Sequence, residues 1–183
     1  MPHQVAGVEW LAGTPVILAL DLSLTGTGYC RVGETGVIKT GKLRGWPRID
    51  HILIGIESAL VSVKVVVLEG YSFGSQGRAV YQIAGLGEIV RYSLWRRGMP
   101  YVDVPPGTLK KYATGKGNAG KDEMIAAAIR RFGFEGSDNN EADAYLLWCM
   151  ARHAYGCSVA TVPAVQAEQV QRLEWPALGA LSA

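Results

Sequence analysis

The amino-acid sequence predicts an α/β fold in which helices flank a mixed five-stranded sheet. Short apolar runs, two of which end in an acid, indicate buried strands, and longer segments with apolar residues at helical spacing indicate helices. The segments follow one another in the order βββ, α, β, α, β, α, α. Three consecutive strands can pair as an antiparallel meander, whereas parallel strands need helical crossovers, so the sheet is expected to be mixed.

The first half of the chain supplies four of the expected strands. They cover residues 16–20, 28–33, 35–43 and 63–68. The first and last are the most apolar, as is typical of central strands, and an acid directly follows each: Asp21 and Glu69. A helix is expected over residues 47–61, because apolar residues recur there at helical spacing and Pro47 suits the first turn.

The second half is expected to be mainly helical. Its elements are a helix over 78–97, a strand over 101–104, and helices over 121–132 and 139–154. A basic, glycine-rich stretch over 110–120 reads as a loop. We expect one domain over 1–155 and a C-terminal appendage over 156–183, which has one short helical pattern near 165–173.

Composition excludes several classes of protein. The chain has 183 residues, 49% of them apolar and 19% charged, which is enough to bury a core without disulfides and too apolar for a disordered protein. No stretch reads as a membrane span or signal peptide, and the three cysteines form no CxxC pair. We therefore expect a cytoplasmic protein with no membrane partner.

The basic residues are unevenly distributed. The net charge is only +2, but nine of the 18 basic residues and three of the 16 acids lie between Arg91 and Arg131. This imbalance predicts either a basic face that binds nucleic acid or an ordinary solvated surface.

The acids at the strand ends predict a metal site. Parallel neighbouring strands would place Asp21 and Glu69 side by side at the carboxyl edge of the sheet, where ligands bind in open α/β folds. Asp143, near the start of the last long helix, would supply a third acid. Carboxylates so close repel one another unless a divalent cation lies between them. The alternative interpretation is that these acids are ordinary surface residues.

The start of the last long helix has a structural interpretation of its own. Asp138 followed three residues later by Glu141 is a capping-box arrangement, and capping is the preferred role for Glu141.

Five strings in this chain resemble RuvC-type Holliday junction resolvases, especially those encoded by phages. They are Leu18-Ala-Leu-Asp-Leu-Ser-Leu-Thr-Gly-Thr-Gly-Tyr29, Val66-Val-Leu-Glu-Gly-Tyr71, Gly107-Thr-Leu-Lys-Lys-Tyr-Ala-Thr-Gly-Lys116, Lys121-Asp-Glu-Met124 and Asn140-Glu-Ala-Asp-Ala144. The resemblance implies a ribonuclease H-like fold and a homodimer in a bacterial or phage-infected cell. It also implies paired cutting of four-way DNA junctions by two Mg²⁺ or Mn²⁺ ions per active site, leaving 5′ phosphate and 3′ hydroxyl ends.

The resemblance also implies residue roles. Asp21, Glu69 and Asp143 match the metal-binding and catalytic acids of the family. The family commonly has an acid or a histidine three positions before the last Asp, where this chain has Asn140. Either Asn140 is a neutral ligand or Asp138 is the fourth ligand.

Candidate DNA contacts lie in two loops. The predicted phosphate-binding residues of the basic stretch are Lys110, Lys111, Lys116 and Lys121. Phe73, in the loop after Glu69, would stack on an unpaired base, as the corresponding aromatic does in the family, and Arg78 follows that loop. The alternatives are a flexible polar loop and, for Phe73, a core position.

Three other functions are compatible with parts of the sequence. A ribonuclease H-like nuclease acting on RNA or RNA-DNA hybrids is the main alternative. An actin-like kinase would share the Asp21-to-Gly28 string, but it needs a second domain for which 183 residues leave no room. A catalytically inactive nucleic-acid-binding module is the third.

Overall fold

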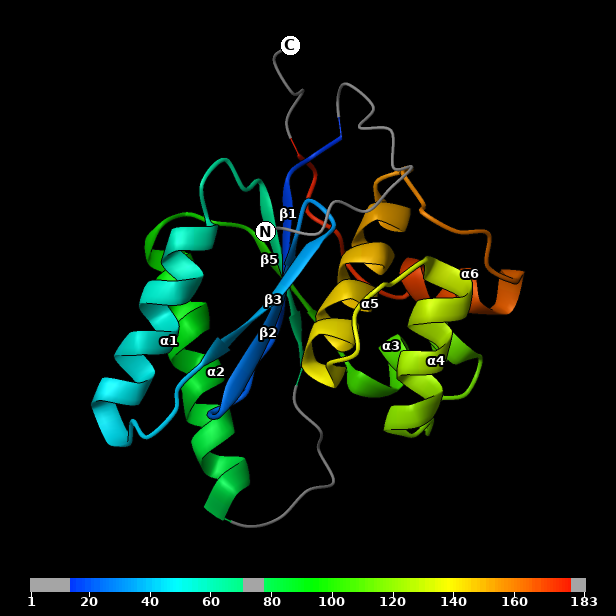
Figure 1. Ribbon diagram of the computed structural model, residues 1–183. Coiled ribbons are helices and arrows are strands. Elements are labelled where there is room, and N and C mark those ends of the chain that lie inside the picture. Colours follow the sequence, from blue (N-terminus) through cyan, green and yellow to red (C-terminus); the bar gives the residue numbers. More distant parts are fainter. Residues whose placement is uncertain (1–13, 71–77, 179–183) are drawn as a thin grey trace.

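The computed structural model describes residues 14–70 and 78–178 of the chain. In this part, five strands form one sheet with the order β3-β2-β1-β4-β5, and helices cover both faces (Figure 1). Helices α1 and α2 lie on one face. Helix α5 lies on the other, with α3, α4 and α6 outside it. The predicted fold, a mixed five-stranded sheet flanked by helices, is confirmed.

The strands are short and the central ones are buried. Their bounds are β1 Ile17–Asp21, β2 Gly26–Arg31, β3 Glu34–Lys39, β4 Val65–Glu69 and β5 Tyr101–Val104. Strand β1 pairs antiparallel with β2 and parallel with β4, and β4 pairs parallel with β5. Strand β2 also pairs antiparallel with β3, so β1, β3, β4 and β5 run in the same direction. Their carboxyl ends therefore share one edge of the sheet.

The helices follow the expected order with one addition. Their bounds are α1 Gly45–Ala59, α2 Arg78–Arg96, α3 Pro106–Thr114, α4 Lys121–Phe132, α5 Asn139–Ala154 and α6 Ala164–Gln171. No helix in the described residues is long and apolar enough to cross a membrane.

Helix α3 corrects the loop predicted for the basic stretch. Pro106 stands in its first turn, where a missing backbone N–H costs nothing, and Leu109, Tyr112 and Ala113 are buried at helical spacing. Gly115 ends the helix in a left-handed conformation, with φ 86°. Lys110 and Lys111 are thus held on a helix, and only the following residues form a connecting loop.

The sheet separates two apolar clusters. Ile17 and Ala19 of β1 pack with α3, α4 and α5, whereas Leu18 and Leu20 pack with α1 and α2. The C-terminal segment joins the first cluster, because α6 contacts α3 and α5 and Val170 is buried there. These layers hold the carboxyl edge of the sheet between two groups of helices.

Candidate active site

Two acids lie next to each other at the carboxyl edge of the sheet. Leu20 of β1 is in register with Leu68 of β4, so the residues that follow, Asp21 and Glu69, end neighbouring parallel strands. Both side chains are partly buried. Parallel pairing of two strands whose preceding apolar residues are all buried thus places two carboxylates side by side, as the sequence predicted.

Helix α5 is brought to the same edge by a glycine. Gly28 of β2 is the register partner of Asp21. A Cβ atom at Gly28 would lie 2.1 Å from the carbonyl oxygen of Asn140 and 2.5 Å from its carbonyl carbon, so this close approach requires glycine. The packing brings the first turns of α5, which carry Asn140 and Asp143, over the end of β1. Sequence reasoning missed this role, for which glycine inside a strand was the available signal.

Electrostatics show that the three acids interact. Burial, the charges of Glu69 and Asp143 and a hydrogen bond with Glu69 raise the pKa of Asp21 to about 9. Burial also raises the pKa of Glu69. Burial and the charge of Glu69 raise the pKa of Asp143 to about 6. The carboxyl groups therefore retain protons that isolated carboxyl groups would lose, because burial disfavours their charged forms and, for Asp21 and Asp143, neighbouring carboxylates repel them as well.

This donor set fits a hard divalent cation. Its members are carboxylates, with the Asn140 amide nearby and no thiolate or imidazole, and a bound cation would stabilise the buried, mutually repelling negative charges. Among the described residues, no three Asp, Glu, His or Cys side chains are already arranged as a metal-ligand group. Binding would thus require the carboxylates to reorient toward the cation.

Two of the four predicted lysines act on these acids. The charge of Lys110, on α3, lowers the pKa values of Glu69 and Asp143, and the charge of Lys121, at the start of α4, lowers those of Asp21 and Asp143. Lys111 is partly exposed on α3, without such an effect. Lys116 instead donates to Glu123 Oε1 at 2.6 Å. Of the four predicted lysines, Lys110 and Lys121 therefore act on the acids, Lys111 follows Lys110 on α3, and Lys116 forms a surface ion pair.

Asp138 and Glu141 occupy different positions from a full capping box. Asp138 caps α5, because its Oδ1 accepts hydrogen bonds from the backbone N–H groups of Asn140 at 2.8 Å and Glu141 at 3.4 Å. Glu141 Oε2 instead accepts a hydrogen bond from the hydroxyl of Thr35 on β3 at 2.8 Å. The capping role expected for Glu141 is therefore corrected, because a strand hydroxyl competes successfully for its carboxylate.

Two predicted DNA contacts cannot be placed. Phe73 lies outside the described residues, and so does the side chain of Arg78, whose backbone begins α2.

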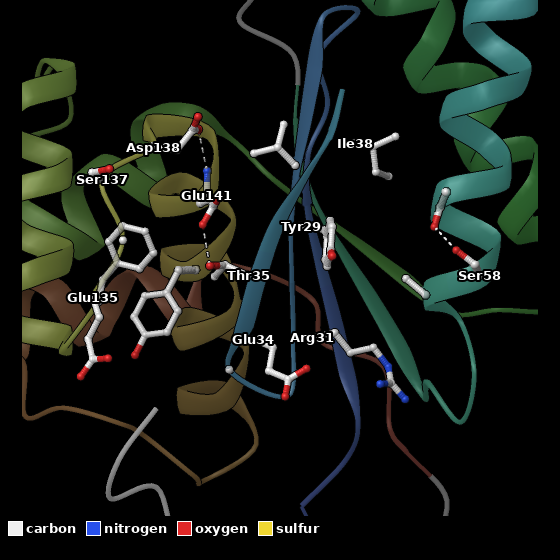
Figure 2. Close-up of a pocket in the computed structure, with 17 residues that line it drawn as sticks. Tyr29, Arg31, Glu34, Thr35, Ile38, Ser58, Glu135, Ser137, Asp138 and Glu141 are labelled. Carbon is white, nitrogen blue, oxygen red and sulfur yellow. Dashed lines mark hydrogen bonds between the residues drawn. The ribbon is translucent and has the colours of Figure 1, made fainter. Parts of the chain in front are cut away.

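A large cavity lies away from the acids. It has a volume of about 1100 Å³ and surrounds the outer edge of β3, between α1 and the segment that leads into α5 (Figure 2). Figure 2 shows Thr35, Glu141 and Asp138 on one side of β3, and Tyr29, Ile38 and Ser58 on the other. None of the three acids of the candidate site lines it.

Comparison with known proteins supports the resemblance seen in the motifs. No family model matches the chain. It is 28% identical over 158 residues to "Crossover junction endodeoxyribonuclease RuvC" of Anaeromyxobacter sp. (strain K), covering 79% of this chain and 85% of the relative. It is 26% identical to the protein of the same name from Synechococcus sp. (strain WH7803), covering 65% of this chain and 84% of the relative.

Solved structures agree with the fold. The Thermus thermophilus RuvC structure matches with a TM-score of 0.57 and 20% identity, over 72% of this chain and 90% of that one. T. thermophilus RuvC in complex with a Holliday junction substrate matches with a TM-score of 0.61 and 19% identity, over 73% and 90%. The chain is thus similar in sequence to RuvC-type resolvases over most of its length, and it has the ribonuclease H-like fold of the solved RuvC structures.

Proposed function

We propose that this protein is a structure-selective endonuclease that resolves four-way DNA junctions, with Asp21, Glu69 and Asp143 as its catalytic acids. The observation that carries the proposal is the convergence of these carboxylates from β1, β4 and α5 at one edge, with Lys110 and Lys121 acting on them. The named relatives and the junction-bound structural neighbour support the choice of substrate.

The residues of the candidate active site would have different roles in catalysis. Asp21, which interacts with both other acids, would hold the metal ions together with Glu69 and Asp143. Bound Mg²⁺ or Mn²⁺ would supply Lewis-acid chemistry for phosphodiester hydrolysis that leaves 5′ phosphate and 3′ hydroxyl ends. Lys110 and Lys121 would attract the phosphate backbone and favour the ionised carboxylates that metal binding needs. Asn140, beside Gly26 and Gly28, would be the neutral fourth ligand.

Paired cutting on opposing strands requires two such sites, and α2 offers a surface for a second copy of the chain. Tyr81, Gly85, Glu88, Tyr92 and Trp95 follow one another at intervals of four and three residues, so they form one stripe. Tyr81 is 79% exposed and Trp95 68%, and Tyr92 stacks on Trp95 with ring centroids 5.9 Å apart. We infer a symmetric homodimer through this α2 stripe.

Cleavage of defined substrates tests the proposal. Four-way junction, flap, RNA-DNA hybrid and plain duplex would be compared with Mg²⁺ and with Mn²⁺. We expect paired cuts in the junction, and loss of cutting with retained junction binding in Asp21→Asn, Glu69→Gln and Asp143→Asn. Preference for the hybrid would replace this function with that of an RNA-directed nuclease. Normal turnover in one of the three variants would remove that residue from the site.

A further inference from the structure

A second basic segment lies between β3 and α1. Residues 39–48, named here the β3–α1 basic loop, contain four basic residues and no acid: Lys39, Lys42, Arg44 and Arg48. Lys39, Lys42 and Arg44 are exposed, and Arg48 is partly so. In the described part of the chain, none of the four forms an ion pair with a carboxylate. The charge is therefore available to a partner outside the chain.

The loop is held at the same edge of the sheet as the acids. Strands β3 and β1 run in the same direction, so Lys39 ends β3 at the edge where Asp21 ends β1. Thr40 ties the loop to the residues that follow Asp21: its hydroxyl donates to the carbonyl of Leu24 at 2.8 Å, and its N–H donates to that of Thr25 at 3.3 Å. The loop thus lies beside the candidate active site in space as well as in topology.

Hydrogen bonds within the β3–α1 basic loop hold its backbone in place. The Leu43 carbonyl accepts hydrogen bonds from Arg44 Nη1 and from Arg48 Nε, both at 2.8 Å, and the Leu43 N–H donates to the carbonyl of Thr40 at 3.0 Å. The ammonium group of Lys42, by contrast, makes no hydrogen bond or ion pair to any described residue. An ordered turn that presents an uncompensated cation suits a polyanion, because little conformational entropy remains to be lost on binding.

The loop and the active-site lysines lie on opposite sides of the acids. Figure 1 shows the start of α1 and the α3–α4 pair at the same end of the molecule but across the sheet from each other. A DNA strand cut at the acids must continue past them in both directions, and Lys110 and Lys121 account for one direction only. No acid stands in the first turn of α1, so its helix dipole adds to the positive potential on the other side.

We propose that the β3–α1 basic loop binds the phosphate backbone of a DNA arm, across the scissile phosphate from Lys110 and Lys121. The inference rests on the proposed function and assigns it a second electrostatic contact. Such contacts carry no sequence information, so they suit an enzyme selective for DNA shape.

Salt-dependent binding tests the loop. Junction affinity would be measured across a range of salt concentrations for chains that carry Asp21→Asn to prevent cutting, alone and combined with Lys42→Ala, Lys42→Glu or Arg44→Ala. Lys64→Glu is the matched control, because Lys64 is exposed at the opposite edge, immediately before β4. We expect Lys42→Ala to weaken binding several-fold for junctions of unrelated sequence and to reduce the salt slope by about one. Lys42→Glu should weaken it further.

Two results would overturn the assignment. If Lys42→Glu and Arg44→Ala keep the salt slope of the Lys64→Glu control while the parent chain binds junctions, the loop makes no phosphate contact and the proposed function stands. If Lys42→Glu instead converts a dimer to a monomer in sedimentation, the loop belongs to a protein interface. A wild-type chain that neither binds nor cuts junctions would refute the proposed function, and the loop assignment with it. Lys42 makes no described contact, so its variants should fold normally.

Discussion

In the metal-free protein, the acids at the sheet edge keep their protons to a higher pH than isolated carboxyl groups do. Asp21, Glu69 and Asp143 all have raised pKa values, and burial is the largest cause in each case. Without metal, each binds a proton in the folded state at a pH where the unfolded chain has lost it. The free energy of unfolding must therefore fall as the pH rises from near 4 toward the folded values of about 6 for Asp143 and about 9 for Asp21.

The first prediction concerns this pH dependence. In EDTA, the melting temperature should decrease between pH 5 and pH 9. Asp21→Asn should make this decrease shallower, because it removes the carboxyl group whose pKa is raised to about 9. Saturating Mg²⁺ should oppose the loss, because the cation binds the ionised carboxylates. Thermal unfolding at several pH values would measure it. An equally steep decrease in Asp21→Asn would mean that other groups cause it.

The second prediction concerns Gly28. Gly28→Ala would push a Cβ atom into the backbone of Asn140, so the start of α5 must move away from β1. We expect a loss of stability of about 1–3 kcal/mol, as for other overpacked sites, together with a loss of cleavage. Gly26→Ala is the comparison, because its new Cβ would meet only side chains, Val37 at 3.0 Å and Asn140 at 3.4 Å. Denaturant unfolding and cleavage assays that show equal effects for both would contradict this account of α5.

Residue positions were predictable where a strong local pattern fixed them. Asp21 and Glu69 end two apolar strands, so parallel pairing of these strands was enough to predict that the two acids lie close together. The Thr35 contact of Glu141 and the Glu123 contact of Lys116 were not predictable, because each depends on which of several polar groups lies nearest after folding.

At the scale of elements, the predictions succeeded where periodicity was long. Helices α4 and α5 have the expected bounds, and α2 begins at the expected residue and ends one residue early. Helix α3 was missed because it has only nine residues between two prolines and a glycine-rich turn. Strand β2 begins two residues earlier than expected: Gly26 and Thr27 read as a loop, but both are buried, and Gly26 lies beside Asn140 of α5.

A third prediction concerns the contact between α2 and β5. Buried Arg91 donates from Nε to both carboxylate oxygens of Asp103, at 3.0 and 3.1 Å. Asp103→Ala would remove this bidentate partner from a buried guanidinium, and we expect a loss of about 2 kcal/mol of stability. Denaturant unfolding would measure the loss, with Asp122→Ala, at an exposed position of α4, as the control. Equal stability of the two variants would show that the pair contributes little.

At the scale of the whole molecule, the order of the strands in the sheet decides which basic residues lie near the acids, and nearness along the chain does not. The basic stretch 91–131 stood out by composition, yet only Lys110 and Lys121 within it act on the acids. Residues 39–48 are denser in positive charge but are divided between a strand, a loop and a helix. Their relation to the acids depends on the strand order, which adjacency along the chain does not reveal.

The fourth prediction tests the dimer. Trp95→Glu, in the α2 stripe, should convert the protein to a monomer at micromolar concentration and replace paired cuts with single nicks, because a charge would be buried at the inferred interface. Ile129→Glu, at a position 47% exposed on α4, is the matched control. Analytical ultracentrifugation and product analysis would measure both. A wild-type monomer that still makes paired cuts would remove the α2 stripe from the interface.

The position of α5 has a consequence for synthesis. Residues 14–104 contain every strand of the described sheet, with both strand-end acids, but Asp143 lies on a helix that the ribosome makes after all of these strands. That helix also covers β1 and β2, so its absence leaves one face of the sheet bare. On the proposed function, a growing chain can hold two of its acids in place without cutting DNA. The chain becomes able to cut DNA only when α5 has been synthesised and has packed on the sheet. Fragments from interrupted translation would therefore leave the genome uncut.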